Sequence, residues 1–262
     1  MFRAALLVAA LAFTGCGSDP PRAARKTPAP IPPAGRGGPP DARAVGFRAG
    51  DGVGLRGRLF GRGRSAVVLA HMGNRPDNES DWYPLARRLA REGYLVLAYN
   101  RRAVCTGEAH PYDCSAGPND FGTSWQDVIG AVKFLEAEGA SRVAVAGSSI
   151  GGTAVVFAAQ TGRIHPAALI SLAGVNHIST YSMDRAGIQR IGGAKLFVCA
   201  RRDPDGAADS ARELSGWARE PKRLVLLDSD LHGTDMLDRR QRTAVPLTAL
   251  IVRFLRGAMP PA

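Results

Sequence analysis

The pentad Gly147-Ser148-Ser149-Ile150-Gly151 places a serine between two glycines, where an apolar strand pattern (142–146) meets a helical one (150–160). A serine on such a sharp strand-to-helix turn projects its hydroxyl from the sheet edge. Small residues at 147 and 151 let the strand and the helix approach each other closely. The pattern therefore predicts a nucleophile elbow with Ser149, and not Ser148, as the nucleophile.

Two other interpretations of the pentad are weighed against this one. In a chain with 31 glycines, such a pattern is also expected by chance as an ordinary strand-to-helix turn. A phosphate-binding turn of a nucleotide fold would carry Gly-x-Gly-x-x-Gly or Gly-Lys-Ser/Thr, and neither motif is present. The elbow also falls on a middle strand and not on the first one.

A serine needs a base to remove its proton, and three histidines follow Ser149 in the chain. His165 precedes a predicted strand, which places it at the end of the sheet remote from the elbow. His177 follows that strand and stays an alternative. His232 follows the last predicted strand, on a loop where Gly233 permits close backbone approach. We identify His232 as the base.

The acid that orients the base is expected after the penultimate strand, in Arg201-Arg202-Asp203-Pro204-Asp205. Asp203 is the first choice. Asp205 is the second, and it is also a candidate cap for a helix that begins near Ala207. Asp228 and Asp230 lie too near His232 in the sequence to be preferred.

Developing charge on a substrate oxygen also requires fixed donors. The amide of Ile150 follows the nucleophile at the start of a helix, whose dipole favours negative charge there. A second donor is expected in the loop after strand 66–70, from the amide of Met72 or Gly73. His71 is interpreted as a residue that organises this loop.

Short apolar runs alternate with helical patterns along the body of the chain, after a predicted β-hairpin at 47–60. The predicted strands cover residues 66–70, 94–99, 142–146, 167–172, 195–200 and 223–227, and the predicted helices 82–92, 125–138, 150–160, 207–219 and 243–255. This alternation predicts an α/β fold with a mostly parallel, doubly wound sheet. Residues 173–194 contain no long helical pattern, so no large lid domain is expected.

Over residues 44–258 the chain resembles the α/β-hydrolase superfamily, including its dienelactone-hydrolase-like and small esterase members. The resemblance rests on Gly147 to Gly151, on the turn at Asp203 and on Leu231-His232-Gly233, in the family's order of serine, aspartate and histidine. It implies a serine hydrolase that cleaves a small ester through an acyl-enzyme, without metal or organic cofactor. Alternatives are an acyltransferase or peptidase on the same triad, or an inactive binding protein that keeps the fold.

The first fifteen residues are typical of a signal peptide, with Arg3 followed by an apolar run at 4–13. The sequence Thr14-Gly15-Cys16 resembles a bacterial lipobox, which implies lipidation of Cys16. Residues 16–43 are Pro-rich and are predicted to form a tether, and residues 44–262 the catalytic domain. We therefore expect a bacterial envelope protein held to a membrane by its lipid. Cleavage by an ordinary peptidase would instead give a soluble secreted or periplasmic protein.

The remaining cysteines fit an exported protein, in which disulfides persist. Cys105 and Cys114 lie nine positions apart in a polar loop and are predicted to form a disulfide, whereas Cys199 lies in an apolar strand and is predicted to be a buried free thiol. The formal net charge of +11 comes without a dense basic run or a nucleic-acid-binding motif. Nucleic acid is therefore not an expected partner.

Overall fold

The computed structural model describes residues 30–33, 37–71, 73 and 77–261. Its main sheet has eight strands in the order β1-β2-β4-β3-β5-β6-β9-β10. The six strands from β4 to β10 are parallel, and β2 joins them as an antiparallel neighbour of β4. This is the mostly parallel sheet predicted from the alternating patterns.

The elements follow one another as the sequence predicts, with bounds that differ by a few residues. The strands are β1 (Ala42–Arg48), β2 (Gly54–Phe60), β3 (Ser65–Ala70), β4 (Leu95–Asn100), β5 (Arg142–Ser148), β6 (Ala168–Leu172), β7 (His177–Ile178), β8 (Tyr181–Ser182), β9 (Ala194–Ala200) and β10 (Lys222–Leu227). The helices are α1 (Tyr83–Arg91), α2 (Ser124–Ala137), α3 (Ile150–Gln160), α4 (Arg185–Arg190), α5 (Ala207–Trp217) and α6 (Ala244–Ala258). Three 3₁₀ turns are η1 (Glu79–Trp82), η2 (Phe121–Thr123) and η3 (Gly233–Leu237).

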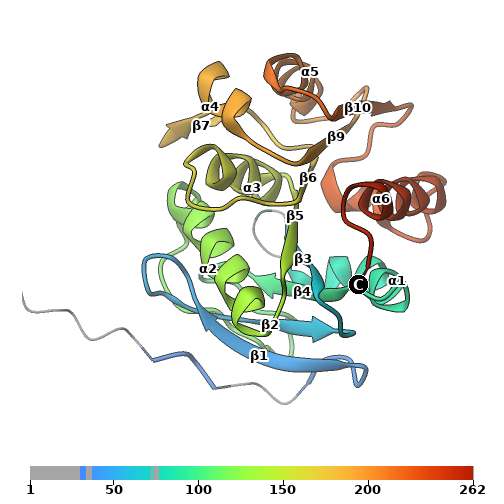
Figure 1. Cartoon of the computed structure of the whole chain (residues 1–262). Coiled ribbons are helices and arrows are strands. Elements are labelled where there is room, and N and C mark those ends of the chain that lie inside the picture. The colour runs from blue at the N-terminus through green and yellow to red at the C-terminus, as the bar shows by residue number, and fades with distance from the viewer. Residues whose placement is uncertain (1–29, 34–36, 72, 74–76, 262) are drawn as a thin grey trace, which may run out of the picture.

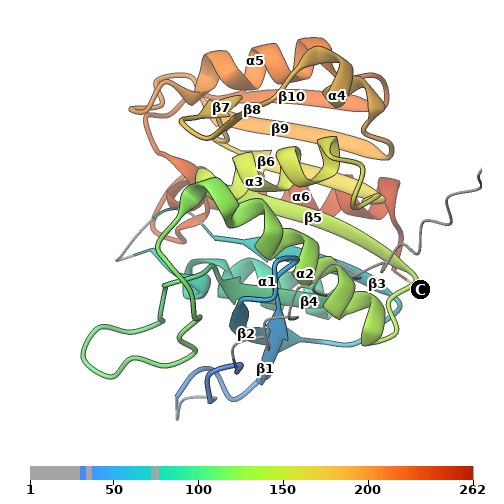
Figure 2. The same ribbon diagram turned by 90° about the vertical axis from the view of Figure 1, so that its left-hand side faces the viewer.

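Helices cover both faces of the sheet. Helices α1 and α6 pack on one face, and α2 and α3 pack on the other, where α4 and α5 continue the layer (Figures 1 and 2). Every residue of β3 and β4 is buried, as expected for central strands covered on two sides. The double covering therefore explains why these strands are apolar throughout and do not alternate.

Parallel strands bring their carboxyl ends to one edge of the sheet, and ligands of open α/β sheets bind outside that edge. Here this edge carries the segments that follow β3, β4, β5, β9 and β10. Between β6 and β9 the chain forms only the β7–β8 hairpin and the six-residue α4. As predicted, no large domain is inserted there.

In the described part of the chain, no helix combines the length and the apolar character that crossing a membrane requires. The predicted signal segment and Cys16 lie outside the described residues.

Candidate active site

Ser149 occupies the turn between β5 and α3, with backbone angles φ 51° and ψ −118°. A positive φ is uncommon for a residue other than glycine, and such strain is found mainly where the surrounding structure enforces it. Here the Ser149 amide donates to the carbonyl of Leu172 on β6 at 2.8 Å, and the Ser149 carbonyl accepts from the Thr153 amide at 2.9 Å. These contacts hold the elbow that the pentad predicts.

The glycines on either side of Ser149 are required by close backbone packing. A Cβ atom on Gly147 would lie 2.1 Å from the carbonyl oxygen of Gly151, and one on Gly151 would lie 2.4 Å from the carbonyl oxygens of Ala70 and His71. Neither position has room for a side chain. The two glycines therefore let α3 start directly over β5 and against the end of β3.

Ser148 faces the interior of the protein. Its side chain is fully buried, and its hydroxyl has no hydrogen-bond partner among the described residues. Ser149, by contrast, is partly exposed. The difference agrees with the choice of Ser149 as the nucleophile.

Asp203 and His232 meet at the same edge, from the ends of β9 and β10. The Nδ1 atom of His232 lies 2.9 Å from Oδ2 of Asp203, whose side chain is completely buried. The other oxygen, Oδ1, accepts from the amides of Asp205 at 3.0 Å and Ala207 at 3.3 Å. The carboxylate is thus fixed by backbone donors while it orients the imidazole.

This arrangement corrects one expectation. Asp205 was a candidate cap for α5, but the N-cap position is Gly206, in a left-handed conformation, and the Asp203 carboxylate accepts the first amide of the helix. The Asp205 side chain is instead 66% exposed, and its Oδ2 lies 3.4 Å from Nε2 of His232. Sequence spacing left Asp203 and Asp205 as alternative partners of His232 and does not reveal which nitrogen each approaches, because that depends on how the two loops fold together.

The structure does not join Ser149 to His232 by a hydrogen bond. Nε2 of His232 is buried and makes no hydrogen bond to any described residue. Hydrogen bonds between a catalytic serine and its base are often long or misaligned before substrate binds. The separation of Ser149 and His232 is thus compatible with a triad. Asp203 and His232 are brought together, and Ser149 lies at the same edge of the sheet.

The other histidines after Ser149 have different surroundings. His177 is exposed on β7, and its Nδ1 contacts the amide oxygen of Asn176 at 2.8 Å. His165 is exposed and precedes β6, at the opposite edge of the sheet. Only His232 of these three has a carboxylate on Nδ1 among the described residues, which favours it as the base.

The predicted oxyanion donors come from two segments. Ile150 is the first residue of α3, so its amide has no acceptor within the helix and lies at the positive end of the helix dipole. Met72 lies outside the described residues. Gly73 is described, and its carbonyl accepts from Nε of Arg101 at 3.2 Å. Arg101 also donates to Asn119 at 2.7 Å, so it ties the β3 loop to the β4 loop.

Cys199 is a buried free thiol, as predicted. Its Sγ atom lies 3.5 Å from Oδ2 of Asp203, the same oxygen that faces His232. Burial and the charge of Asp203 raise the pKa of this thiol to about 12. It is therefore a neutral donor to the candidate acid and not a nucleophile.

Asp77, Asp81 and Asp235 lie near one another, and Asp77 and Asp235 also lie near His232. Burial and repulsion from Asp235 raise the pKa of Asp77, while the charge of His232 opposes that shift. Burial raises the pKa of Asp81 to about 6, although its hydrogen bond from the Asn78 amide favours the ionised form. The surroundings of the base are thus acidic. Asp235 is close to His232 in the sequence, whereas the approach of Asp77 depends on how a distant loop folds.

The segment after β4 contains the disulfide between Cys105 and Cys114, as predicted. A buried polar network fixes it to the rest of the domain. The Asn100 amide group donates to Thr106 Oγ1 at 2.8 Å and to the Asp113 carbonyl at 2.9 Å, and Arg58 donates to the Asp113 carboxylate at 2.5 Å. The cysteine loop is therefore tied to the sheet by more than the disulfide.

Glu79 belongs to the same network. Its Oε1 atom accepts from the hydroxyl of Tyr83 at 2.9 Å and lies 3.3 Å from that of Thr106. Burial, and after it the neighbouring charge of Asp113, raise the pKa of Glu79 well above its usual range. Glu79, the first residue of η1, is thus buried in surroundings that disfavour its ionised form.

Within residues 30–33, 37–71, 73 and 77–261, no group of three or more His, Cys, Asp or Glu side chains has an arrangement that could hold a metal ion.

Comparison with known proteins identifies the architecture. Residues 66–190 match the family model described as alpha/beta hydrolase fold. This chain has the α/β-hydrolase fold. A structure of an α/β serine hydrolase without a lid from Xanthomonas campestris is 17% identical, with a TM-score of 0.65 over 86% of this chain and 98% of that one. An esterase from Pyrococcus furiosus is 16% identical, with a TM-score of 0.63 over 83% and 91% of the two chains.

A third similar structure is an enol-lactonase from Burkholderia xenovorans. It is 17% identical, with a TM-score of 0.61 over 80% of this chain and 99% of that one. At these identities the similarity establishes the fold, and the chemistry must be argued from the residues of this chain.

Proposed function

We propose that this protein is a serine hydrolase that cleaves a small carboxylic ester, with Ser149 as nucleophile, His232 as base and Asp203 as the orienting acid. The observation that carries the proposal is the 2.9 Å contact between His232 Nδ1 and a buried Asp203 carboxylate, at the sheet edge where Ser149 occupies a strained elbow. The esterase and hydrolase folds to which the chain is similar support it.

The proposed reaction has two steps of acyl transfer. Ser149 Oγ attacks the ester carbonyl while His232 Nε2 takes its proton, and the same nitrogen then protonates the leaving alcohol. Asp203 keeps the proton of the neutral imidazole on Nδ1, which leaves Nε2 free to act as the base. Water, activated by His232, releases the acid and regenerates Ser149.

The oxyanion formed in each step needs donors that are already in place. We assign one to the Ile150 amide at the start of α3 and the other to the amide of Met72 or Gly73. Arg101 supports the second assignment, because its hydrogen bond to the Gly73 carbonyl fixes the backbone of that loop. The reaction requires no cofactor.

Labelling with a fluorophosphonate probe tests the proposal. The wild-type protein and Ser148→Ala should be labelled, whereas Ser149→Ala should not, with all three showing the same circular dichroism. Persistent labelling of the Ser149 variant would place the nucleophile elsewhere. A panel of p-nitrophenyl esters of increasing acyl length, with amides and an added alcohol acceptor, then separates an esterase from a peptidase and from an acyltransferase.

We also propose that the protein is an envelope lipoprotein, cleaved before Cys16 and anchored to a membrane by lipid on that residue. The sequence of residues 1–16 supports this proposal. The Pro-rich tether at 16–43 would then separate the anchor from the hydrolase domain that starts near residue 44.

A further inference from the structure

A cavity that is not lined by Ser149, Asp203 or His232 lies on the face of the sheet covered by α1 and α6. It has a volume of about 700 Å³ and opens between these two helices. Its lining residues are Pro84, Leu85, Arg87, Arg88, Arg91, Leu237, Arg239, Ala244, Val245, Thr248 and Ala249. The proposed hydrolase does not use this groove, which we call the α1–α6 groove.

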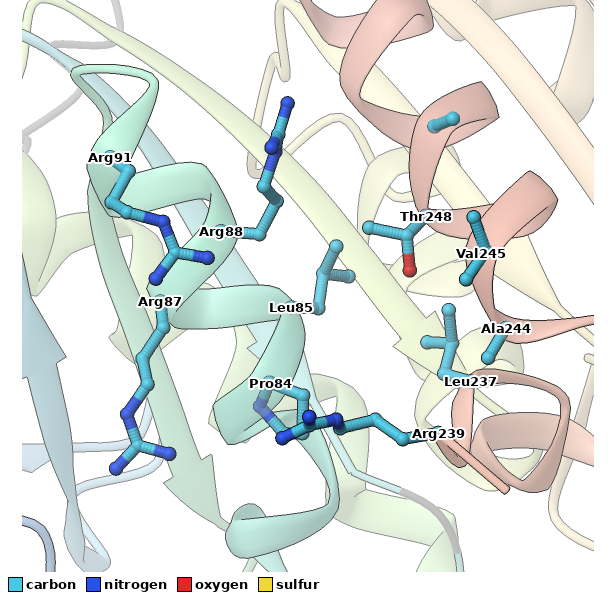
Figure 3. A pocket seen from close by; sticks show the side chains of 11 residues that line it. Pro84, Leu85, Arg87, Arg88, Arg91, Leu237, Arg239, Ala244, Val245 and Thr248 are labelled. Carbon is cyan, nitrogen blue, oxygen red and sulfur yellow. The ribbon is translucent and has the colours of Figure 1, made fainter. Parts of the chain in front are cut away.

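The two sides of the groove differ in character. Figure 3 shows Arg87, Arg88 and Arg91 along α1, whereas the facing side is formed by Leu237, Ala244, Val245 and Thr248. Arg239 lies across one end of the groove, next to Pro84 (Figure 3). One side is therefore cationic and the other mainly apolar.

Val245 shows that the apolar side is open to solvent. It is 79% exposed, and it is the one exposed large apolar side chain among the described residues. Beside it, Leu237 and Ala244 are buried and supply the wall of the groove. Val245 alone is no apolar patch, and it bears on binding only because it lies at the mouth of a cavity whose other side carries arginines.

The charges of the groove are only partly neutralised. Arg87 pairs with Asp41 at 2.7 Å, and Arg88 pairs with Glu92 at 2.6 Å. Arg91 also acts on Asp41, since both arginines lower the pKa of that carboxyl, and Arg239 has no carboxylate within 4 Å in the described part of the chain. No acidic residue lines the groove. An anionic occupant would complement it.

We propose that the α1–α6 groove binds an anionic phospholipid. The phosphate would lie toward the arginines, and an acyl chain would lie against Leu237, Ala244 and Val245. Apolar residues flanked by arginines are the combination by which amphipathic surfaces bind anionic membranes. The other conceivable occupants are an acidic peptide and a second copy of this chain, and the experiment below distinguishes each of them from the lipid.

The N-terminal end of the domain lies beside the groove, because Asp41 pairs with an arginine that lines it. Asp41 is the residue before β1, and its ion pair with Arg87 places the start of the domain at the rim of the groove. Gly37 also contacts the domain, because Arg58 donates to its carbonyl at 2.7 Å. A tether over residues 17–29 would span up to about 45 Å when extended and cannot by itself orient the domain. Lipid binding in the groove would turn this face of the domain to the membrane.

Binding of a monomeric lipid analogue tests the proposal. The ligand is the dihexyl ether analogue of phosphatidylglycerol, which has no ester to hydrolyse, and the comparison ligand is the corresponding phosphatidylcholine analogue. The protein is the full chain with Cys16→Ser, which cannot carry the anchor. Calorimetry should show saturable binding of the anionic analogue and weaker binding of the zwitterionic one.

Two variants of the groove and one matched control test whether the lipid analogue binds there. Arg91→Glu with Arg239→Glu should weaken binding about tenfold or more, because each basic residue near an anionic lipid strengthens its binding. Val245→Ser should weaken it without a change of charge. Lys133→Glu with Arg185→Glu makes the same charge change on α2 and α4, across the sheet, and should leave the affinity unchanged.

Three outcomes would overturn the proposal. The first is no saturable binding of the anionic analogue. The second is an equal loss of affinity in Arg91→Glu with Arg239→Glu and in the control, and the third is a dimer in analytical ultracentrifugation that Val245→Ser dissociates. A dimer would assign the groove to a second copy. Binding to an acidic peptide but not to the lipid analogue would assign it to a protein partner. Fluorophosphonate labelling should be equal in all variants, so failure here is separable from failure of the proposed hydrolase.

Discussion

Asp203 and Asp205 lie two positions apart and contact opposite nitrogens of His232, so their variants distinguish their roles. In Asp203→Asn the side-chain amide can donate to Nδ1, which favours the imidazole tautomer with its proton on Nε2. We expect kcat toward an activated ester to fall by about 10⁴. Asp205→Asn should change kcat by less than about tenfold, because the Asp205 side chain is mostly exposed and bonds neither Nδ1 nor the backbone of α5.

Steady-state kinetics of both variants, with circular dichroism to verify the fold, measures this difference. Equal and small losses would remove Asp203 from the triad. A large loss only in Asp205→Asn would instead exchange the roles of the two carboxylates.

The raised pKa of the buried Glu79 predicts that stability depends on pH. Its pKa is raised in the folded protein, so the folded state keeps a proton that the unfolded chain releases near pH 4.5. The stabilisation from this residue is therefore complete below that pH and is lost progressively as the pH rises toward the folded-state pKa. Glutamine needs no proton to be neutral, so Glu79→Gln should lack this loss.

Urea unfolding at pH 5 and pH 8 measures the effect. The free energy of unfolding of Glu79→Gln minus that of wild type should be more positive at pH 8 than at pH 5, because only the wild type loses stability over this range. If the two proteins changed in parallel with pH, Glu79 would be ionised in the fold.

The elements that position the site were predictable because their signals are local. Apolar runs locate the strands, and Gly147 and Gly151 locate the elbow, since the turn leaves no space for a Cβ atom at either position. Asp205 was the second candidate partner of His232, but its approach to Nε2 was not predictable, nor was the burial of Glu79 beside Asp113. Both depend on contacts between loops distant in sequence, for which residue spacing carries no signal.

The cysteine loop after β4 is predicted to be partly independent of its disulfide. Cys105→Ser with Cys114→Ser should lower the free energy of unfolding by about 2–3 kcal/mol, the model-dependent value for so short a ring. The fold should persist, because the two backbone hydrogen bonds between Thr106 and Tyr112 and the side chain of Asn100 still hold the loop.

Urea unfolding and peptide mapping without reductant test the bond. The loop follows β4 at the edge of the sheet that carries Ser149, so kinetics of the double variant with the ester panel test whether it forms one wall of the substrate pocket. Two free thiols in properly exported protein would contradict the disulfide. Unchanged acyl preference would confine its role to stability.

The whole molecule joins a hydrolase fold to an N-terminal segment of very different composition. The mostly parallel sheet and the absence of a large lid domain were both predicted from the alternating patterns, because helices on both faces make every central strand apolar. The α1–α6 groove was not predicted. Its arginines and apolar residues come from α1 and from residues 237–249, two segments far apart in sequence. Each of the helices α1 and α6 alone resembles an ordinary amphipathic helix.

The N-terminal segment gives the last prediction. If Cys16 is the lipidated first residue of the mature protein, the exported protein should fractionate with membranes, and mass spectrometry should find an acylated N-terminal peptide that begins at Cys16. Cys16→Ala should block lipidation and the processing that depends on it. Fluorophosphonate labelling of Ser149 should not change, because the domain beyond residue 44 has its own core and its own site. Cleavage at another bond with an unmodified Cys16 would make the protein soluble after export and leave the proposed catalysis untouched.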